Sequence, residues 1–227
     1  MIHGCLLRVW GNVIVDYKGV VDKGLSDVMR RIENKLKRLD PREPGNTRKR
    51  WFLEAALQGN QAVVMFSGRI ADCCKEQAEQ EKDETRRREL LKLEDICRNV
   101  PLNPARTFHE AVQSIYMILL AVHLESNGHA ISLGRFDQYV YPYYKKDLEE
   151  GRITREEALE IVECFFIKCN ELNKLRSWPD TEFFLGYQMF INLAIAGQTV
   201  DGKDATNEVS HLCVEACENV RLFTPSY

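Results

Sequence analysis

The chain has 227 residues, of which 44% are hydrophobic and 29% are charged, and its formal net charge is −3. This balance is ordinary for a soluble globular protein, and the length allows one large domain or two small ones. The lack of a basic excess argues against a nucleic-acid partner, and no apolar run reaches the ~20 residues that a membrane span needs. Because no charged and then apolar segment follows Met1, we expect no signal peptide, no membrane contact and a cytoplasmic protein.

Eight cysteines are spread along the chain, and in a reducing compartment they should be thiols. No Cys-x-x-Cys pair occurs, which argues against a zinc ribbon and a thioredoxin motif. Cys213 and Cys217 lie one helical turn apart with His211 nearby, but no third and fourth ligand for a metal is evident. We therefore expect no metal site and interpret the cysteines as small buried apolar residues.

Apolar residues at steps of three or four predict that the first hundred residues are mostly helical. The predicted helices are residues 24–39, 47–81 and 83–99. Two glycines, Gly59 and Gly68, are expected to loosen the second of these helices. Residues 1–22 are expected to be irregular, apart from a short strand at 13–15.

The next helix, residues 107–125, opens on a capping box. Thr107 is expected to cap the first turn, while the side chain of Glu110 bonds back to the start of the helix. The helix is apolar on nearly every side, and a helix of that kind is buried inside a larger protein.

The stretch 128–138 is expected to be a short strand that ends in a turn at Gly134 and presents three functional side chains, those of His129, Arg135 and Asp137. Polar groups at a strand end beside a buried helix are typical of a ligand site in an α/β protein. The residue types leave an alternative open, in which Arg135 and Asp137 form a structural pair and His129 is a capped surface residue.

The second half of the chain continues as alternating helices and strands, which indicates an α/β protein with parallel strands joined by right-handed crossovers. The predicted elements are helices at 139–150, 154–172 and 205–219 and strands at 190–196 and 220–223. Thr154 and Glu157 form a second capping box, and Asp204 is expected to cap the last helix. A turn is expected at Asp201-Gly202.

Several long motifs resemble those of one enzyme family, in the same order and spacing. They are residues 106–113, 125–139, 141–147, 151–154 and 197–208. Together they resemble the glycyl radical enzymes of the pyruvate formate-lyase family, in its glycerol and diol dehydratase-like branch. The motif at 136–139 resembles the dehydratases more than the acetyl-transferring pyruvate formate-lyases.

The resemblance implies a fold: a ten-stranded α/β barrel of two antiparallel half-barrels, surrounded by helices. Residues 1–105 would be mainly outer helices and residues 106–227 the first barrel strands and helices of a single domain. The chain would then be a helix-rich fragment with about three strands and an open strand edge, prone to associate. Four apolar side chains of the helix at 107–125 are then not expected to be buried together: Ile115, Met117, Leu119 and Val122.

The resemblance also implies chemistry and partners. A backbone glycyl radical, installed by a separate S-adenosylmethionine-dependent activating enzyme, generates a thiyl radical on a cysteine inside the barrel. The thiyl abstracts hydrogen from a small-molecule substrate. In the dehydratases a neighbouring glutamate acts as base and water is lost, and other members cleave carbon–carbon bonds. A closed cavity suits this chemistry, because it keeps reactive intermediates from side reactions.

The family's catalytic cysteine motif and its glycyl radical loop are interpreted as lying beyond this chain. We therefore expect roughly a third or less of a family member, with no catalytic residue of its own. Cys73 and Cys74 are not taken for the family's cysteine pair, because they lie in an outer helical segment. Two alternatives stay open: a non-catalytic binding or regulatory subunit that completes a barrel with a partner chain or as a homo-oligomer, and an inactive truncated product.

His129 and Asp137 are the substrate-binding residues that the resemblance implies. In the glycerol dehydratases the pair at 129–130 is His-Ser, and both residues contact substrate hydroxyls, whereas Ala130 here has no hydroxyl. The family often has Gly-His near the start of the homologous region, where Gly11-Asn12 stands here, and asparagine does not titrate near neutral pH. Both changes argue against glycerol itself as the substrate.

Overall fold

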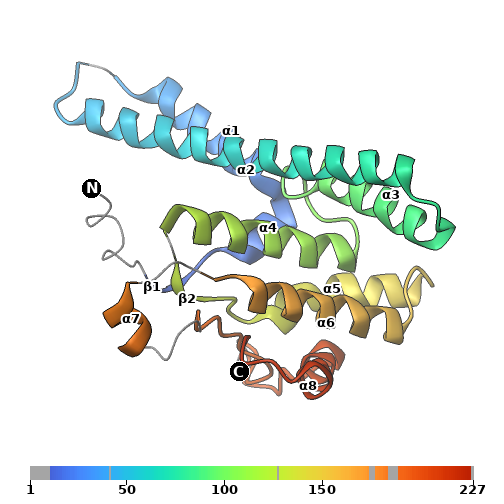
Figure 1. Ribbon diagram of the computed structural model, residues 1–227. Helices are drawn as coiled ribbons and strands as arrows, with labels where there is room; N and C mark the ends of the chain where they lie inside the picture. Colours follow the sequence, from blue (N-terminus) through green and yellow to red (C-terminus); the bar gives the residue numbers. More distant parts are fainter. Residues whose placement is uncertain (1–10, 41, 127, 174–176, 184–188, 226–227) are drawn as a thin grey trace. The chain divides into compact units, whose positions relative to one another are not determined.

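The computed structural model describes residues 11–40, 42–126, 128–173, 177–183 and 189–225 (Figure 1). The chain forms two compact units. Unit 1 consists of Met1–Tyr17 and Arg106–Tyr227, and unit 2 of Lys18–Ala105. Among the described residues, no helix is long and apolar enough to cross a membrane.

The described residues of unit 2 form helices joined by short loops. They are α1 (Tyr17–Arg38, whose first residue belongs to unit 1), α2 (Asn46–Gln80) and α3 (Glu84–Asn99). α2 and α3 pack along one another as a hairpin, because only residues 81–83 connect them. Small buried side chains on α2, including Ser67 and Ala71, allow this close approach. α2 is one helix through Gly59 and Gly68, where the sequence suggested a looser part.

α1 begins at Tyr17, seven residues before the predicted start, and contains a break at Gly24. The backbone of Gly24 has φ 73°, and a Cβ atom there would lie 2.3 Å from the carbonyl oxygen of Leu102. On the far side of the break, the Leu25 amide donates to the Pro101 carbonyl at 2.8 Å. Only glycine allows this contact, so Gly24 holds the break inside α1 against the loop that follows α3.

Unit 1 is built around a pair of parallel strands, β1 (Gly11–Ile14) and β2 (His129–Ser132). Gly11 lies opposite His129, and Ile14 lies opposite Ser132. The predicted strand near residue 13 is therefore confirmed, and the structure shows that it pairs in parallel with β2.

Residues 189–194 form a third extended segment, which runs along β2. The Ala130 amide donates to the Met189 carbonyl at 2.8 Å, and the Leu133 amide donates to the Asn192 carbonyl at 2.7 Å. A strand pairs on only two sides, so β2 lies between β1 and the 189–194 segment. This segment corresponds to the strand predicted at 190–196.

Figure 1 shows the helices of unit 1 beside its sheet. They are α4 (Phe108–Ser126), α5 (Phe136–Glu149), α6 (Arg155–Glu171), α7 (Trp178–Phe183) and α8 (Glu208–Val220). α4 packs against α5, α6 and β2, and α8 packs against α5 and α6. All of these except α7 were predicted from the sequence, with starts or ends that differ by up to three residues.

The apolar residues of α4 are better covered than the sequence suggested. Ile115, Met117 and Leu119 are each 0% exposed, and Val122 is half-buried. The expectation that the four are not all buried holds for Val122, but the first three are buried although no complete barrel is present. The reason is that α5 and α6 bury α4 within unit 1 itself, so its burial does not require a complete barrel.

The two predicted capping boxes differ in outcome. The second one is complete: the Glu157 amide donates to the Thr154 hydroxyl at 3.1 Å, and the Thr154 amide donates to the Glu157 carboxylate at 2.8 Å. In the first, the Glu110 amide donates to the Thr107 hydroxyl at 3.2 Å, as expected. The Glu110 carboxylate, however, accepts from the amide and the guanidinium of Arg106, because that residue offers both donors at once.

The last helix is capped by Asn207, and the predicted cap at Asp204 is wrong. The Asn207 side-chain oxygen accepts from the Val209 amide at 2.9 Å, whereas the Asp204 carboxylate accepts from the amide of Thr206. The predicted turn at Asp201-Gly202 is present, with Gly202 at φ 80°.

The strand predicted at 220–223 is absent from the described residues. α8 runs to Val220, and Arg221 ends it in a left-handed conformation with φ 51°.

We predict that Ile14→Lys lowers self-association of the isolated chain. β1 has no strand on its outer side among the described residues, and Ile14 is 66% exposed. Open edges pair with other chains, and a lysine on the edge opposes such pairing. Light scattering after size-exclusion chromatography measures the effect. Phe223→Lys is the matched control, because Phe223 is also 66% exposed but lies outside the sheet. A monodisperse parent chain, or an equal response in both variants, would contradict the prediction.

Candidate functional site

Two side chains at the start of α5 hold one distant piece of backbone. The Arg135 guanidinium donates to the carbonyl of Ala196 at 2.6 Å and to that of Gln198 at 2.9 Å. The Asp137 Oδ2 atom accepts from the Ala196 amide at 2.7 Å and from the Ser210 hydroxyl at 2.5 Å. Arg135 and Asp137 therefore both bind this backbone segment, and among the described contacts no ion pair joins the two side chains. They fix the course of the chain just after the 189–194 segment.

The Asp137 carboxylate lies in a closed environment. Asp137 is 0% exposed, and its second oxygen, Oδ1, has no hydrogen-bond partner among the described residues. Burial raises the pKa of the Cys213 thiol, and the nearby Asp137 charge adds to that rise. Burial likewise raises the pKa of the Tyr139 hydroxyl, with a smaller effect of the same carboxylate. One oxygen of Asp137 is therefore bound within the fold, and the other is buried without a hydrogen-bond partner among the described residues.

The backbone beside His129 is strained. The side chain of His129 lies outside the described residues, but its backbone is the first position of β2. The next residue, Ala130, has φ 54°, and Phe190 on the neighbouring segment also has φ 54°. A left-handed conformation costs a non-glycine residue about 1–2 kcal/mol. Such residues gather at functional sites, where the surrounding structure holds them in place. The strain therefore supports the predicted site at this point of the sheet.

Metal ligands do not gather in the described part of the chain: no group of three or more His, Cys, Asp or Glu side chains there could hold an ion. On α8, Cys213 is buried whereas His211 is exposed, so they lie on different faces of the helix. Cys73 and Cys74 lie on α2 in unit 2, a helical segment as the sequence predicted.

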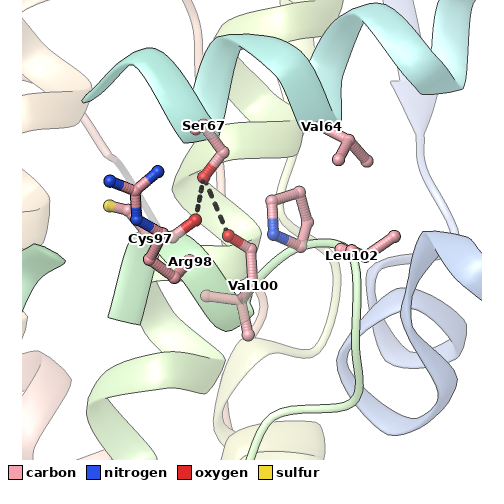
Figure 2. A pocket seen from close by; sticks show the side chains of 8 residues that line it. Val64, Ser67, Cys97, Arg98, Val100 and Leu102 are labelled. Carbon is pink, nitrogen blue, oxygen red and sulfur yellow. Dashed lines mark hydrogen bonds between the residues drawn. The ribbon is translucent and has the colours of Figure 1, made fainter. Parts of the chain in front are cut away.

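Unit 2 contains a small cavity between α2 and the end of α3, of about 210 Å³ (Figure 2). Its hydroxyl, that of Ser67, is already engaged by the carbonyls of Cys97 and Val100 at 2.9 and 2.8 Å. The Arg98 guanidinium contacts the Asp72 carboxylate at 2.6 Å, and burial raises the pKa of the Cys97 thiol to about 11. Pockets for small molecules are usually larger, about 300–1,000 Å³, with several convergent polar groups. This cavity is therefore a packing feature.

The run Arg8-Val9-Trp10-Gly11 has the Arg-Val-x-Gly spacing that the resemblance implies for a glycyl radical loop. The first three of these residues lie outside the described part of the chain. Gly11 belongs to β1 and pairs with His129 in the sheet, so it lies in a strand rather than in a loop.

A family model described as pyruvate formate lyase-like matches residues 7–227. The chain belongs to the pyruvate formate lyase-like family. It is 39% identical over 213 residues to an isethionate sulfite-lyase of Nitratidesulfovibrio vulgaris, and this match covers 92% of the chain and 26% of that protein. It is also 32% identical to a trans-4-hydroxy-L-proline dehydratase of Clostridioides difficile, with 91% of the chain and 27% of that protein covered.

Solved structures match at the level of the fold. A Roseburia inulinivorans protein studied for 1,2-propanediol dehydration is 44% identical, with a TM-score of 0.92. The match covers 95% of this chain and 27% of the Roseburia inulinivorans chain. The glycerol-bound, B12-independent glycerol dehydratase of Clostridium butyricum is 38% identical, with a TM-score of 0.90 and the same coverage. The chain is thus a helix-rich segment that spans about a quarter of the length of these relatives, and the predicted resemblance to glycyl radical enzymes is confirmed.

We predict that Asp137→Asn lowers the free energy of unfolding by about 2 kcal/mol, because hydrogen bonds to a charged group contribute about 1.5–3 kcal/mol. The carboxamide oxygen of asparagine can still accept from the Ala196 amide and the Ser210 hydroxyl, but these hydrogen bonds no longer go to a charged group and are weaker. Urea unfolding measures the loss, and hydrogen exchange should show a less protected Ala196 amide. Asp201→Asn, at an exposed turn, is the control and should leave the midpoint nearly unchanged. Unchanged stability and exchange in the Asp137 variant would show that this carboxylate does not hold the segment.

We predict that Ala130→Gly raises the free energy of unfolding by about 1 kcal/mol, since glycine adopts the left-handed conformation without the steric cost. Ala62→Gly, at an exposed helical position of α2, is the matched control and should lower the free energy of unfolding by about 1 kcal/mol. Chemical denaturation of both variants is the measurement. A less stable Ala130 variant would mean that packing of the buried methyl group outweighs the strain.

Proposed function

We propose that this chain is part of a glycyl radical enzyme that cleaves a C–O or C–C bond of a small substrate. The observation that carries the proposal is the match to the Roseburia inulinivorans protein, at 44% identity and a TM-score of 0.92 over 95% of the chain. The names of the relatives point in the same direction, since they are dehydratases and lyases of small hydroxylated compounds.

In the whole enzyme, β1, β2 and the 189–194 segment would be strands of a ten-stranded barrel made of two half-barrels. Their parallel pairing and the outer edge of β1, which no described strand covers, support this proposal. Helices α4, α5 and α6 would cover the outside of the barrel, and residues 1–105 would be mainly outer helices of the same domain.

The radical chemistry would be supplied by other parts of the whole enzyme. A separate radical S-adenosylmethionine enzyme would install the glycyl radical, and a cysteine of the barrel would pass it to the substrate as a thiyl radical. The residues of this chain would bind the substrate, orient it and exclude water. We further propose a cytoplasmic protein, which acts in a homo-oligomer or together with a partner chain.

The proposed substrate contacts are His129 and Asp137. His129 would offer an imidazole at the start of β2, next to the strained Ala130. Asp137 would have to use its Oδ1 atom, because Oδ2 is engaged by Ala196 and Ser210. Since Ala130 cannot donate a hydroxyl hydrogen bond, the site favours a small hydroxylated compound other than glycerol.

A segment exchange tests the proposal. The matching quarter of the Roseburia inulinivorans protein is replaced by these 227 residues, and the resulting enzyme is treated anoxically with its activating enzyme and S-adenosylmethionine. We expect a glycyl radical doublet in electron paramagnetic resonance and turnover of propane-1,2-diol. The 227-residue chain alone is the control and should give no doublet. A folded exchange enzyme that carries the radical but turns over no small hydroxylated substrate would contradict the proposal.

In the exchange enzyme, we predict that His129→Ala raises KM about fivefold, because one hydrogen bond to a neutral group contributes about 1 kcal/mol. Steady-state kinetics with propane-1,2-diol measure the change. His211→Ala is the matched control, since His211 is an exposed imidazole on α8, and its KM should not change. Equal kinetics for the two variants would return His129 to a structural role.

A further inference from the structure

The sheet of unit 1 has one face that packs on helices. The residues that point to this face are Ile131, Leu133, Ile191 and Leu193, which are 0–3% exposed. The residues next to these in the chain point to the other face, because successive side chains of an extended chain point to opposite sides. On that face Ser132 is half-exposed, and Asn192 and Ala194 are exposed. The described residues therefore leave one side of the sheet uncovered, which we call the open face.

Cross-strand contacts complete the open face. Ile14 lies opposite Ser132 in the parallel pairing. A Cβ atom on Gly134 would lie 3.1 Å from the Ile14 side chain, so these two residues are neighbours on the same side. The hydrogen bond from the Leu133 amide to the Asn192 carbonyl, 2.7 Å long, fixes Asn192 beside β2. The open face thus consists of Ile14, Ser132, Gly134, Asn192 and Ala194.

The open face carries no charged side chain. Of its five residues only Ser132 and Asn192 carry polar side chains, and both a hydroxyl and a carboxamide can donate and accept hydrogen bonds. The adjacent cation, Arg135, already donates to the carbonyls of Ala196 and Gln198. A neutral hydroxyl group can pair with such a surface, whereas an anion would leave its charge uncompensated there.

We infer that Ser132 and Asn192 are specificity-determining contacts that bind a neutral hydroxyl group of the substrate. The inference rests on the proposed function, because it places the substrate on the open face. The inference adds Ser132 and Asn192 to the proposed substrate contacts, and both of these side chains are uncharged.

The exchange enzyme also tests the inference. Ser132→Ala and Asn192→Ala are each expected to raise KM for propane-1,2-diol about fivefold with little change in kcat, because each removes one hydrogen bond that binds ground state and transition state alike. Asn219→Ala is the matched control, since Asn219 contacts Glu163 on the helical surface, and its KM should not change. The radical content, counted by electron paramagnetic resonance, shows whether each variant has folded.

Asn192→Asp keeps the size of the side chain and replaces the alanine variant in the test if the alanine variant carries no radical. It is expected to raise KM at least as much as alanine does, because it replaces a donor by a negative charge. Unchanged KM in the Ser132 and Asn192 variants, with the His129 variant still impaired, would overturn the inference and leave the proposed function standing. An exchange enzyme without turnover would overturn both.

Discussion

The buried carboxylate of Asp137 joins three parts of unit 1. Asp137 lies in the first turn of α5. Its carboxylate accepts one hydrogen bond from the Ala196 amide, just after the 189–194 segment, and another from the Ser210 hydroxyl on α8. Hydrogen bonds to a buried charge are strong, and removal of one partner leaves the other unsatisfied. Because the 189–194 segment pairs with β2, this one carboxylate also supports the geometry of the sheet that carries the candidate site.

The sheet is strained at the position where function is expected. Ala130 and Phe190 adopt left-handed conformations on adjacent extended segments, and the Ala130 amide bonds the carbonyl of Met189, the residue before Phe190. Neither residue is a glycine, so the conformation must be held by its surroundings. Arg135 and Asp137 anchor the chain that follows the 189–194 segment, and the helices bury Ile131 and Leu133 on the other face of β2. Rigid support of this kind is what a substrate-binding wall requires, since small displacements weaken binding and orientation.

α4 is buried within unit 1, without the rest of a longer relative. A helix that is apolar on nearly every side suggested an interior that only a complete barrel could provide. In the structure α5, α6 and β2 bury Ile115, Met117 and Leu119, so unit 1 has its own hydrophobic core. What it leaves uncovered is the open face and the outer edge of β1. In the proposed barrel, further strands would pair at the outer edge of β1, and the open face would line the interior.

The sequence by itself determined the features that depend on near neighbours. Apolar periodicity located α2 and α6, and a capping box with a continuous apolar run located α4. The Thr154–Glu157 capping box was found because its hydrogen bonds span only three residues. Long motifs identified the family. Only the tertiary structure decided the roles of Arg135 and Asp137, which the sequence allowed to be a structural pair with each other. Their partners lie 59 to 73 residues further along the chain, and no local pattern records contacts at that separation. The burial of α4 and the composition of the open face were decided in the same way, because both depend on which distant segments the fold brings together.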